Sequence, residues 1–121
     1  MRALPDVITT ITLPSGSVTV DEHGYLTSPA DWTPDFVNLV AAQENLTLSP
    51  LHHEVIGFMR EYYDLHGVAA DARFVLKYLA ARNGLTKSGA KQALFSLFPY
   101  GYVKQACKIA GMKQPRAWST G

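Results

Sequence analysis

The feature that most constrains the fold is a change of hydrophobic period at about residue 33. Thr33-Pro34 and Ser49-Pro50 each combine a favoured helix N-cap with proline at the first helical position, and apolar residues at helical spacing follow both. Before this point, residues 7–20 are rich in β-branched side chains and are interrupted by Pro14-Ser15-Gly16. The sequence therefore predicts a hairpin followed by helices.

The remaining helix signals complete this architecture. Gly67 and Gly84 are expected to end the second and third helices, and a fifth helix is expected over about Tyr102–Ala110. A turn at His23-Gly24 precedes a short third strand at Tyr25-Leu26. The predicted class is α+β, a small N-terminal β-meander or hairpin packed on an array of about five helices. We expect one domain over residues 1–121, with residues 112–121 as a flexible C-terminal arm.

Charge is divided unevenly along the chain. The formal net charge is +1, but residues 1–71 hold two bases against all ten acids, whereas residues 72–121 hold nine bases and no acid. Such asymmetry has two readings. Either the halves pack together and offset each other's charge, or the second half presents a basic working face.

Composition excludes several other classes of protein. With 47% hydrophobic and 17% charged residues, the chain is globular rather than disordered. No apolar run approaches the roughly 18 residues of a membrane span, and residues 1–10 lack the apolar core of a signal peptide. A cytoplasmic protein that does not engage a membrane is expected. A single cysteine excludes an internal disulfide and a cysteine-based zinc site.

Cys107 is the first candidate for chemistry. On an α-helix it would lie at the edge of an apolar face, beside the stripe formed by Lys104 and Lys108. Two flanking ammonium groups favour a reactive thiolate. A lone cysteine on an apolar stripe is also a common inert core thiol, and a position in the last helical turn disfavours an anion.

Other chemistry is poorly represented. The adjacent His52 and His53 point about 100° apart on a helix, so they are expected to be surface or partly buried imidazoles rather than metal ligands. No phosphate loop, nucleophile elbow or HExxH pattern is present, and no metal or cofactor is expected. The basic half supplies the candidate binding residues, which are Arg73, Lys77, Tyr100, Lys104 and Lys108.

Several motifs, in order, resemble the DsrC/TusE family over about residues 16–115. They are VDEHGYL at 20–26, Asp31-Trp32, Ser49-Pro50 with His52, FMREYY at 58–63, LFPYG at 97–101 and KQACKIAG at 104–111. The resemblance implies a β-meander on a helical array. It also implies a role as the gamma-type partner of dissimilatory sulfite reductase or as a sulfur-relay protein of tRNA thiolation. Such members carry sulfur on cysteine and dock on larger partners.

The resemblance also shows a departure. Family members place their principal cysteine next to last, on a C-terminal arm, and Cys107 matches only the second cysteine of the sulfite-reductase branch. Here Thr120-Gly121 look like the residues just before the principal cysteine. Either the sequence stops short of that cysteine, or this is a divergent paralogue that has lost it. Tyr102, Ala70 and His53 also stand where other residues are usual in the family, which favours the paralogue.

Two functions follow as hypotheses. The first is a sulfur-metabolism protein, a carrier at most rather than a self-sufficient enzyme. It docks on a sulfurtransferase or sulfite-reductase-type complex through its basic half, with Cys107 as the sulfur acceptor. The second is a non-catalytic regulatory or binding paralogue whose basic half contacts nucleic acid or an acidic protein surface. In this second version Cys107 only packs.

Overall fold

The computed structural model describes residues 8–113. The N-terminal strands are β1 (Thr9–Leu13) and β2 (Gly16–Val20). A 3₁₀ turn η1 (Pro29–Asp31) precedes the α-helices, which are α1 (Pro34–Gln43), α2 (Pro50–His66), α3 (Ala72–Asn83) and α4 (Lys87–Leu97). The last helix, η2 (Tyr102–Cys107), is a π-helix. The hairpin and helices confirm the predicted α+β class.

The hairpin is antiparallel, with Leu13 paired to Gly16 across the turn and Thr9 to Val20 at the open end. The predicted third strand is reduced to one bridge, between Val20 and Leu26. The carboxylate of Asp21 explains this correction, because it accepts the backbone N–H groups of His23 at 2.9 Å and Tyr25 at 3.0 Å. The chain therefore turns tightly where a longer ladder would need an extended backbone.

The helix ends agree well with the local sequence signals. Ser49 caps α2 in a reciprocal capping box with His52, and Gly67 and Gly84 end α2 and α3 in the left-handed conformation. Thr33 precedes α1 as predicted but makes no side-chain cap. Its hydroxyl lies 3.0 Å from the hydroxyl of Ser15, so it joins the hairpin turn to the helix instead.

The fifth helix differs from its predicted form. The N–H of Ala106 donates to the carbonyl of Gly101, five residues back, at 3.3 Å. The N–H of Met112 likewise donates to the carbonyl of Cys107, also five residues back, at 3.0 Å. Helical geometry of the α type covers only the short stretch after Cys107. The wider π turn changes which side chains face the core, and this bears directly on Cys107.

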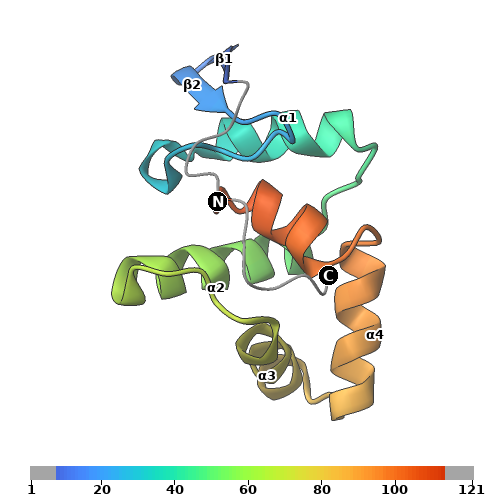
Figure 1. Ribbon diagram of the computed structural model, residues 1–121. Coiled ribbons are helices and arrows are strands. Elements are labelled where there is room, and N and C mark those ends of the chain that lie inside the picture. Colours follow the sequence, from blue (N-terminus) through green and yellow to red (C-terminus); the bar gives the residue numbers. More distant parts are fainter. Residues whose placement is uncertain (1–7, 114–121) are drawn as a thin grey trace.

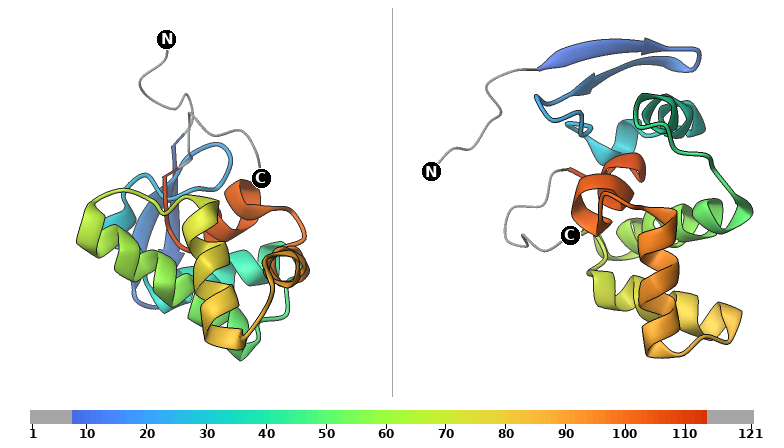
Figure 2. Two further views of the ribbon diagram at one scale, coloured as in Figure 1. Left: turned by 90° about the horizontal axis from the view of Figure 1, so that it is seen from below. Right: turned by 90° about the vertical axis from the view of Figure 1, so that its right-hand side faces the viewer.

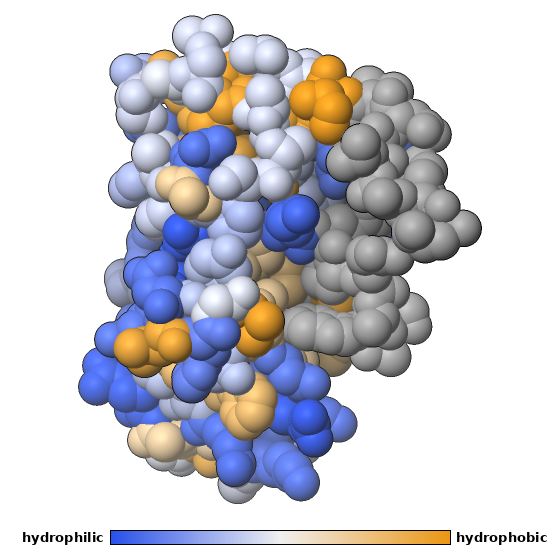
Figure 3. Space-filling model, turned by 60° about the vertical axis from the view of Figure 1, so that its left-hand side comes forward, coloured by the Kyte–Doolittle hydropathy of each residue, from blue (hydrophilic) through white to orange (hydrophobic). Residues whose placement is uncertain are grey.

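The elements are arranged around η2 (Figure 1). The hairpin and α1 lie toward one end of the molecule, α3 and α4 lie toward the other, and η2 lies between them beside α2 (Figures 1 and 2). Figure 3 shows one face, largely hydrophilic with separate hydrophobic patches. Within residues 8–113, no helix is long and apolar enough to cross a membrane.

Candidate functional site around Cys107

Cys107 lies in the core of the protein. Its side chain is 0% exposed, and its neighbours Ala106, Ile109 and Ala110 are equally enclosed. Lys104 is the exposed residue of η2. The predicted position at the edge of an apolar face therefore differs from the observed one, because the helix is π-helical and is covered on nearly all sides.

Burial controls the acidity of this thiol. It raises the pKa of Cys107 to about 12, and a hydrogen bond with the Tyr102 side chain only partly opposes that rise. Burial also raises the pKa of Tyr102, whose hydroxyl donates to the carbonyl of Ala70 at 2.5 Å. Since the thiolate is the nucleophilic form, Cys107 is a poor nucleophile at neutral pH in this conformation.

Tyr25 closes the same region from the N-terminal part of the chain. Its hydroxyl donates to the carbonyl of Val103 at 2.9 Å. Burial, followed by the charges of Cys107, Asp21 and Glu44, raises the pKa of Tyr25 to about 12. Tyr25 and Tyr102, which come from different segments, thus each donate a hydrogen bond to a backbone carbonyl close to the buried thiol.

The two lysines beside Cys107 in sequence do not lower its pKa. Lys108 donates instead to the carboxylate of Glu44 at 2.7 Å, where the two side chains are 17% and 13% exposed. The same carboxylate accepts from Gln105 at 2.8 Å, and Gln105 in turn accepts the backbone N–H of Tyr100 at 3.1 Å. Lys108 therefore anchors η2 to the end of α1.

The chain after η2 is held by Arg60 and Trp32. Arg60 donates to the carbonyl of Ala110 at 3.0 Å and to that of Pro29 at 2.9 Å, and its guanidinium lies 4.8 Å from the centre of the Trp32 ring. The Trp32 indole N–H donates to the carbonyl of Ile109 at 3.0 Å. These contacts orient the backbone that leads out of η2.

Sequence reasoning missed the residues of these anchors. Glu44, Gln105, Arg60 and Tyr25 were not singled out for a role around Cys107, because their partners lie far away along the chain. Tyr25, Trp32, Arg60 and Gln105 do fall inside the motifs that carry the family resemblance, whereas Glu44 does not. That was the one available signal, and it did not say what the residues contact.

The other predicted binding residues lie apart from the thiol. Arg73 and Lys77 are exposed one turn apart on α3 and line a hollow together with Lys87 and Lys91 of α4. Arg73 also pairs with Asp71 at 3.2 Å. Tyr100 is 62% exposed in the turn before η2. Of the predicted set, the structure therefore brings Arg73 and Lys77 together on α3, beside lysines of α4 that were not predicted, and it turns Lys108 inward.

The histidine prediction needs one correction. His52 is buried, where surface or partly buried imidazoles were expected. Its Nδ1 accepts the backbone N–H of Ser49 at 2.9 Å, and its Nε2 donates to the carbonyl of Leu97 at 2.7 Å. The imidazole thus joins the start of α2 to the end of α4. Between residues 8 and 113 no group of three or more His, Cys, Asp or Glu side chains could hold a metal ion.

Comparison with known proteins identifies the family. The model of the family described as "DsrC like protein" matches residues 13–117. The chain belongs to this family. It is 40% identical over 98 residues to "Sulfurtransferase TusE" of Photorhabdus laumondii, covering 81% of this chain and 87% of the relative. The protein of the same name from Escherichia coli (strain K12) is 36% identical, with 81% and 89% covered.

Solved DsrC-type structures share the fold. The DsrC protein of Allochromatium vinosum superposes with a TM-score of 0.79 at 36% identity, covering 93% of this chain and all of the other. Dissimilatory sulfite reductase I (DsrI) gives 0.77 at 28% identity, with 92% and 100% covered. This DsrC-like chain is thus a sulfur-relay protein of the DsrC/TusE type.

Proposed function

We propose that this DsrC-like protein docks on a larger sulfurtransferase or sulfite-reductase-type complex through its basic half, which comprises the end formed by α3 and α4 and the adjoining η2. One observation carries the proposal. Lys77, Lys87, Lys91 and Lys104 are exposed, and none of them forms an ion pair with another residue in the range 8–113. Uncompensated charge on one end of a protein speeds association with an acidic partner and orients it.

Binding to purified complexes tests this function. The full chain is mixed with a sulfurtransferase complex and, separately, with a sulfite-reductase-type complex from the same organism, and affinity is measured at increasing salt. Because exposed charges are screened beyond about 10 Å at 0.1 M salt, affinity should fall as salt rises. Failure to bind either complex at low salt would overturn the proposal.

Sulfur transfer on Cys107 is the second candidate, favoured because Cys107 is the one cysteine among these 121 residues. In this version docking first opens η2, and Cys107 loses its proton to solvent. The thiolate then attacks the terminal sulfur of a cysteine persulfide on the partner. The donor's S–S bond breaks, a new S–S bond forms on Cys107, and the donor cysteine leaves as a thiolate.

Intact-mass measurement separates the two candidates. A persulfide donor is added to the free chain, to the chain with its partner complex, and to Cys107→Ser in both conditions. The enclosed thiol predicts no gain of a sulfur atom on the free chain. A gain on the wild type only in the presence of the complex supports transfer, and an equal gain on Cys107→Ser eliminates it.

Nucleic-acid binding by the basic half receives no support from the relatives named above, whose descriptions concern sulfur transfer and sulfite reduction. A short duplex DNA therefore serves as the control ligand in the binding experiment. Affinity for DNA equal to that for the complexes would mark the charged end as a general polyanion surface, because phosphate contacts dominate such binding.

A further inference from the structure

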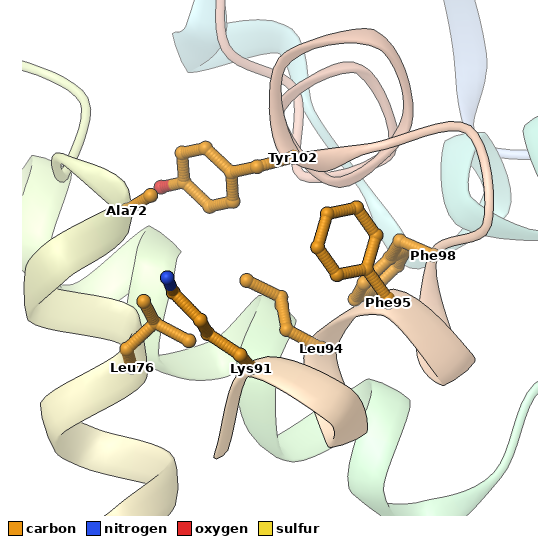
Figure 4. A pocket seen from close by; sticks show the side chains of 7 residues that line it. All are labelled: Ala72, Leu76, Lys91, Leu94, Phe95, Phe98 and Tyr102. Atoms are coloured by element: carbon orange, nitrogen blue, oxygen red, sulfur yellow. The ribbon is translucent and has the colours of Figure 1, made fainter. Parts of the chain in front are cut away.

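A groove runs between α3 and α4. It consists of two adjoining hollows with volumes of about 630 Å³ and 260 Å³, and Leu76 and Lys91 line both. Figure 4 shows the smaller hollow, where the side chains of Leu76 on α3 and Lys91 on α4 lie next to each other and Tyr102 of η2 lies above them. The groove thus extends from the α3–α4 pair to the beginning of η2.

The lining has an apolar floor and a basic rim. Leu76 and Ala80, both half-buried, lie one turn apart on α3, and the buried side chains of Leu94 on α4 and Phe98 after it line the smaller hollow from beneath. The rim carries Arg73, Lys77, Lys87 and Lys91. A floor of this kind, bordered by charge along two helices, matches the way proteins receive an amphipathic helix.

Charge determines what kind of helix fits. Among the described residues that line the two hollows, none is acidic. Arg73 is partly satisfied by Asp71, but Lys77, Lys87 and Lys91 pair with no acid in residues 8–113. An occupant with acidic residues beside its apolar stripe would neutralise these lysines. Residues 114–121 of this chain contain Arg116 and no acid, so their charge does not match the groove.

Two phenylalanines add apolar contact area beside the floor. Phe95 is 59% exposed and lines the smaller hollow, whereas Phe74 is 40% exposed and lines the larger one. Aromatic side chains left exposed on a monomer are typical anchors of protein interfaces. Nucleic-acid phosphates would meet the lysines but leave this apolar surface uncovered, so the combination favours a protein segment.

We propose that the α3–α4 groove binds an acidic amphipathic helix of a partner protein, with leucine-like residues on the floor and Asp or Glu against the lysines. This inference rests on the proposed docking function and names its surface and the chemistry of its partner. It predicts that apolar pattern and charge are both required for binding.

A designed peptide provides the probe. A fluorescent helical peptide of about 18 residues, or five turns, carries Leu at i, i+3, i+4 and i+7 and Glu on both flanks. A control peptide has the same composition with the Leu residues spread around the helix. The patterned peptide should bind the full chain at least about tenfold more tightly than the control, about 1.4 kcal/mol. Equal binding of the two peptides overturns the inference.

Matched charge reversals locate the binding site. Lys77→Glu with Lys91→Glu should weaken peptide binding by about tenfold. Arg82→Glu with Lys113→Glu makes the same change of net charge outside the groove and should leave binding within about twofold. Phe95→Ser, at an exposed position, should weaken binding about fivefold without changing net charge. Circular dichroism confirms that each variant is folded, and an effect of the control pair as large as that of the groove pair contradicts the proposal.

The remaining outcomes separate this inference from the docking function. If the wild type binds a complex and Lys77→Glu with Lys91→Glu leaves that binding unchanged, only the groove inference fails. If the wild type binds neither complex, docking fails, and the peptide result still decides the chemistry of the groove. Sedimentation tests a second copy as occupant. If the chain self-associates, the groove variants abolish that self-association and the peptide does not bind, the inference is overturned. DNA binding that the groove variants abolish overturns it as well.

Discussion

The last helix and the α3–α4 groove belong to the same basic part of the sequence but have opposite environments. Along η2, Lys108 is turned inward against Glu44 and Cys107 is enclosed. Along the groove, Lys77, Lys87 and Lys91 face solvent without an acidic partner in the described range 8–113. A lysine of the basic segment is therefore a structural anchor in one place and a solvent-exposed charge in the other.

This difference separates the two roles that one basic segment was expected to combine. The thiol and its neighbouring lysine were expected to act together as a sulfur acceptor with electrostatic support. In the structure Lys108 packs against Glu44, and the exposed lysines without an acidic partner in residues 8–113 lie on α3, on α4 and, as Lys104, on η2. The residues of the proposed docking surface are thus exposed whereas the thiol is buried, so substitutions can change one without the other.

The largest expected effect concerns thiol reactivity. Raising the pKa of Cys107 from 9.0 to about 12 lowers its thiolate fraction at pH 8 by about a thousandfold relative to an ordinary thiol. Iodoacetamide should therefore modify the native chain at least about a thousandfold more slowly than the urea-unfolded chain, as followed by intact mass. Comparable rates would show that η2 opens readily and would remove the contrast between the two regions.

The second effect compares two glycines, one in each region. Gly111 follows η2 at φ +80°, and a Cβ there would lie 2.4 Å from a Trp32 ring atom. Gly84, in the turn between α3 and α4, has φ +62° and open space around it. Gly111→Ala should lower the free energy of unfolding by about 3 kcal/mol, through overpacking and strain.

Gly84→Ala is the matched control for that substitution. It introduces backbone strain alone, so a loss of about 1 kcal/mol is expected. Urea denaturation of both variants measures the difference. Equal losses in the free energy of unfolding would mean that the segment after η2 accommodates the added methyl group as readily as the α3–α4 turn does.

The third effect concerns the buried anchor. Glu44→Ala removes the acceptor shared by Gln105 and Lys108 and leaves two enclosed donors without it, so the free energy of unfolding should fall by about 2 kcal/mol. Lys77→Ala, in the groove, should change it by less than about 0.5 kcal/mol. If urea denaturation gives the same small change for both, Lys108 behaves like a surface lysine.

The smallest effect is a dependence of stability on alkaline pH. The pKa of Cys107 is raised on folding, so the folded state holds this proton more tightly than the unfolded state. The resulting stability is complete below about pH 9 and is lost as pH rises toward about 12. From pH 8 to pH 10, wild type should lose about 1 kcal/mol more than Cys107→Ala in urea denaturation. If wild type and Cys107→Ala lose the same free energy of unfolding between pH 8 and pH 10, the pKa of the buried thiol is not raised on folding.

The sequence alone predicted the helical array well where the signals are local. Ser49 and Gly67 act through atoms within one helical turn, so their effects hold before any tertiary contact forms. The third strand failed for a local reason as well, because the carboxylate of Asp21 binds nearby N–H groups that a longer strand would have used in a ladder. The π-helix lacked any local signal, and the α-helical spacing assumed for it misplaced Cys107.

What the sequence determined by itself was the order of elements, the family, and the separation of acidic and basic residues along the chain. Each of these depends on residue identity and short-range spacing. Only the tertiary structure decided which basic side chains remain in solvent and whether the thiol can ionise. Burial and ion pairing depend on partners far away in sequence, as Glu44 is from Lys108 and Tyr25 from Val103.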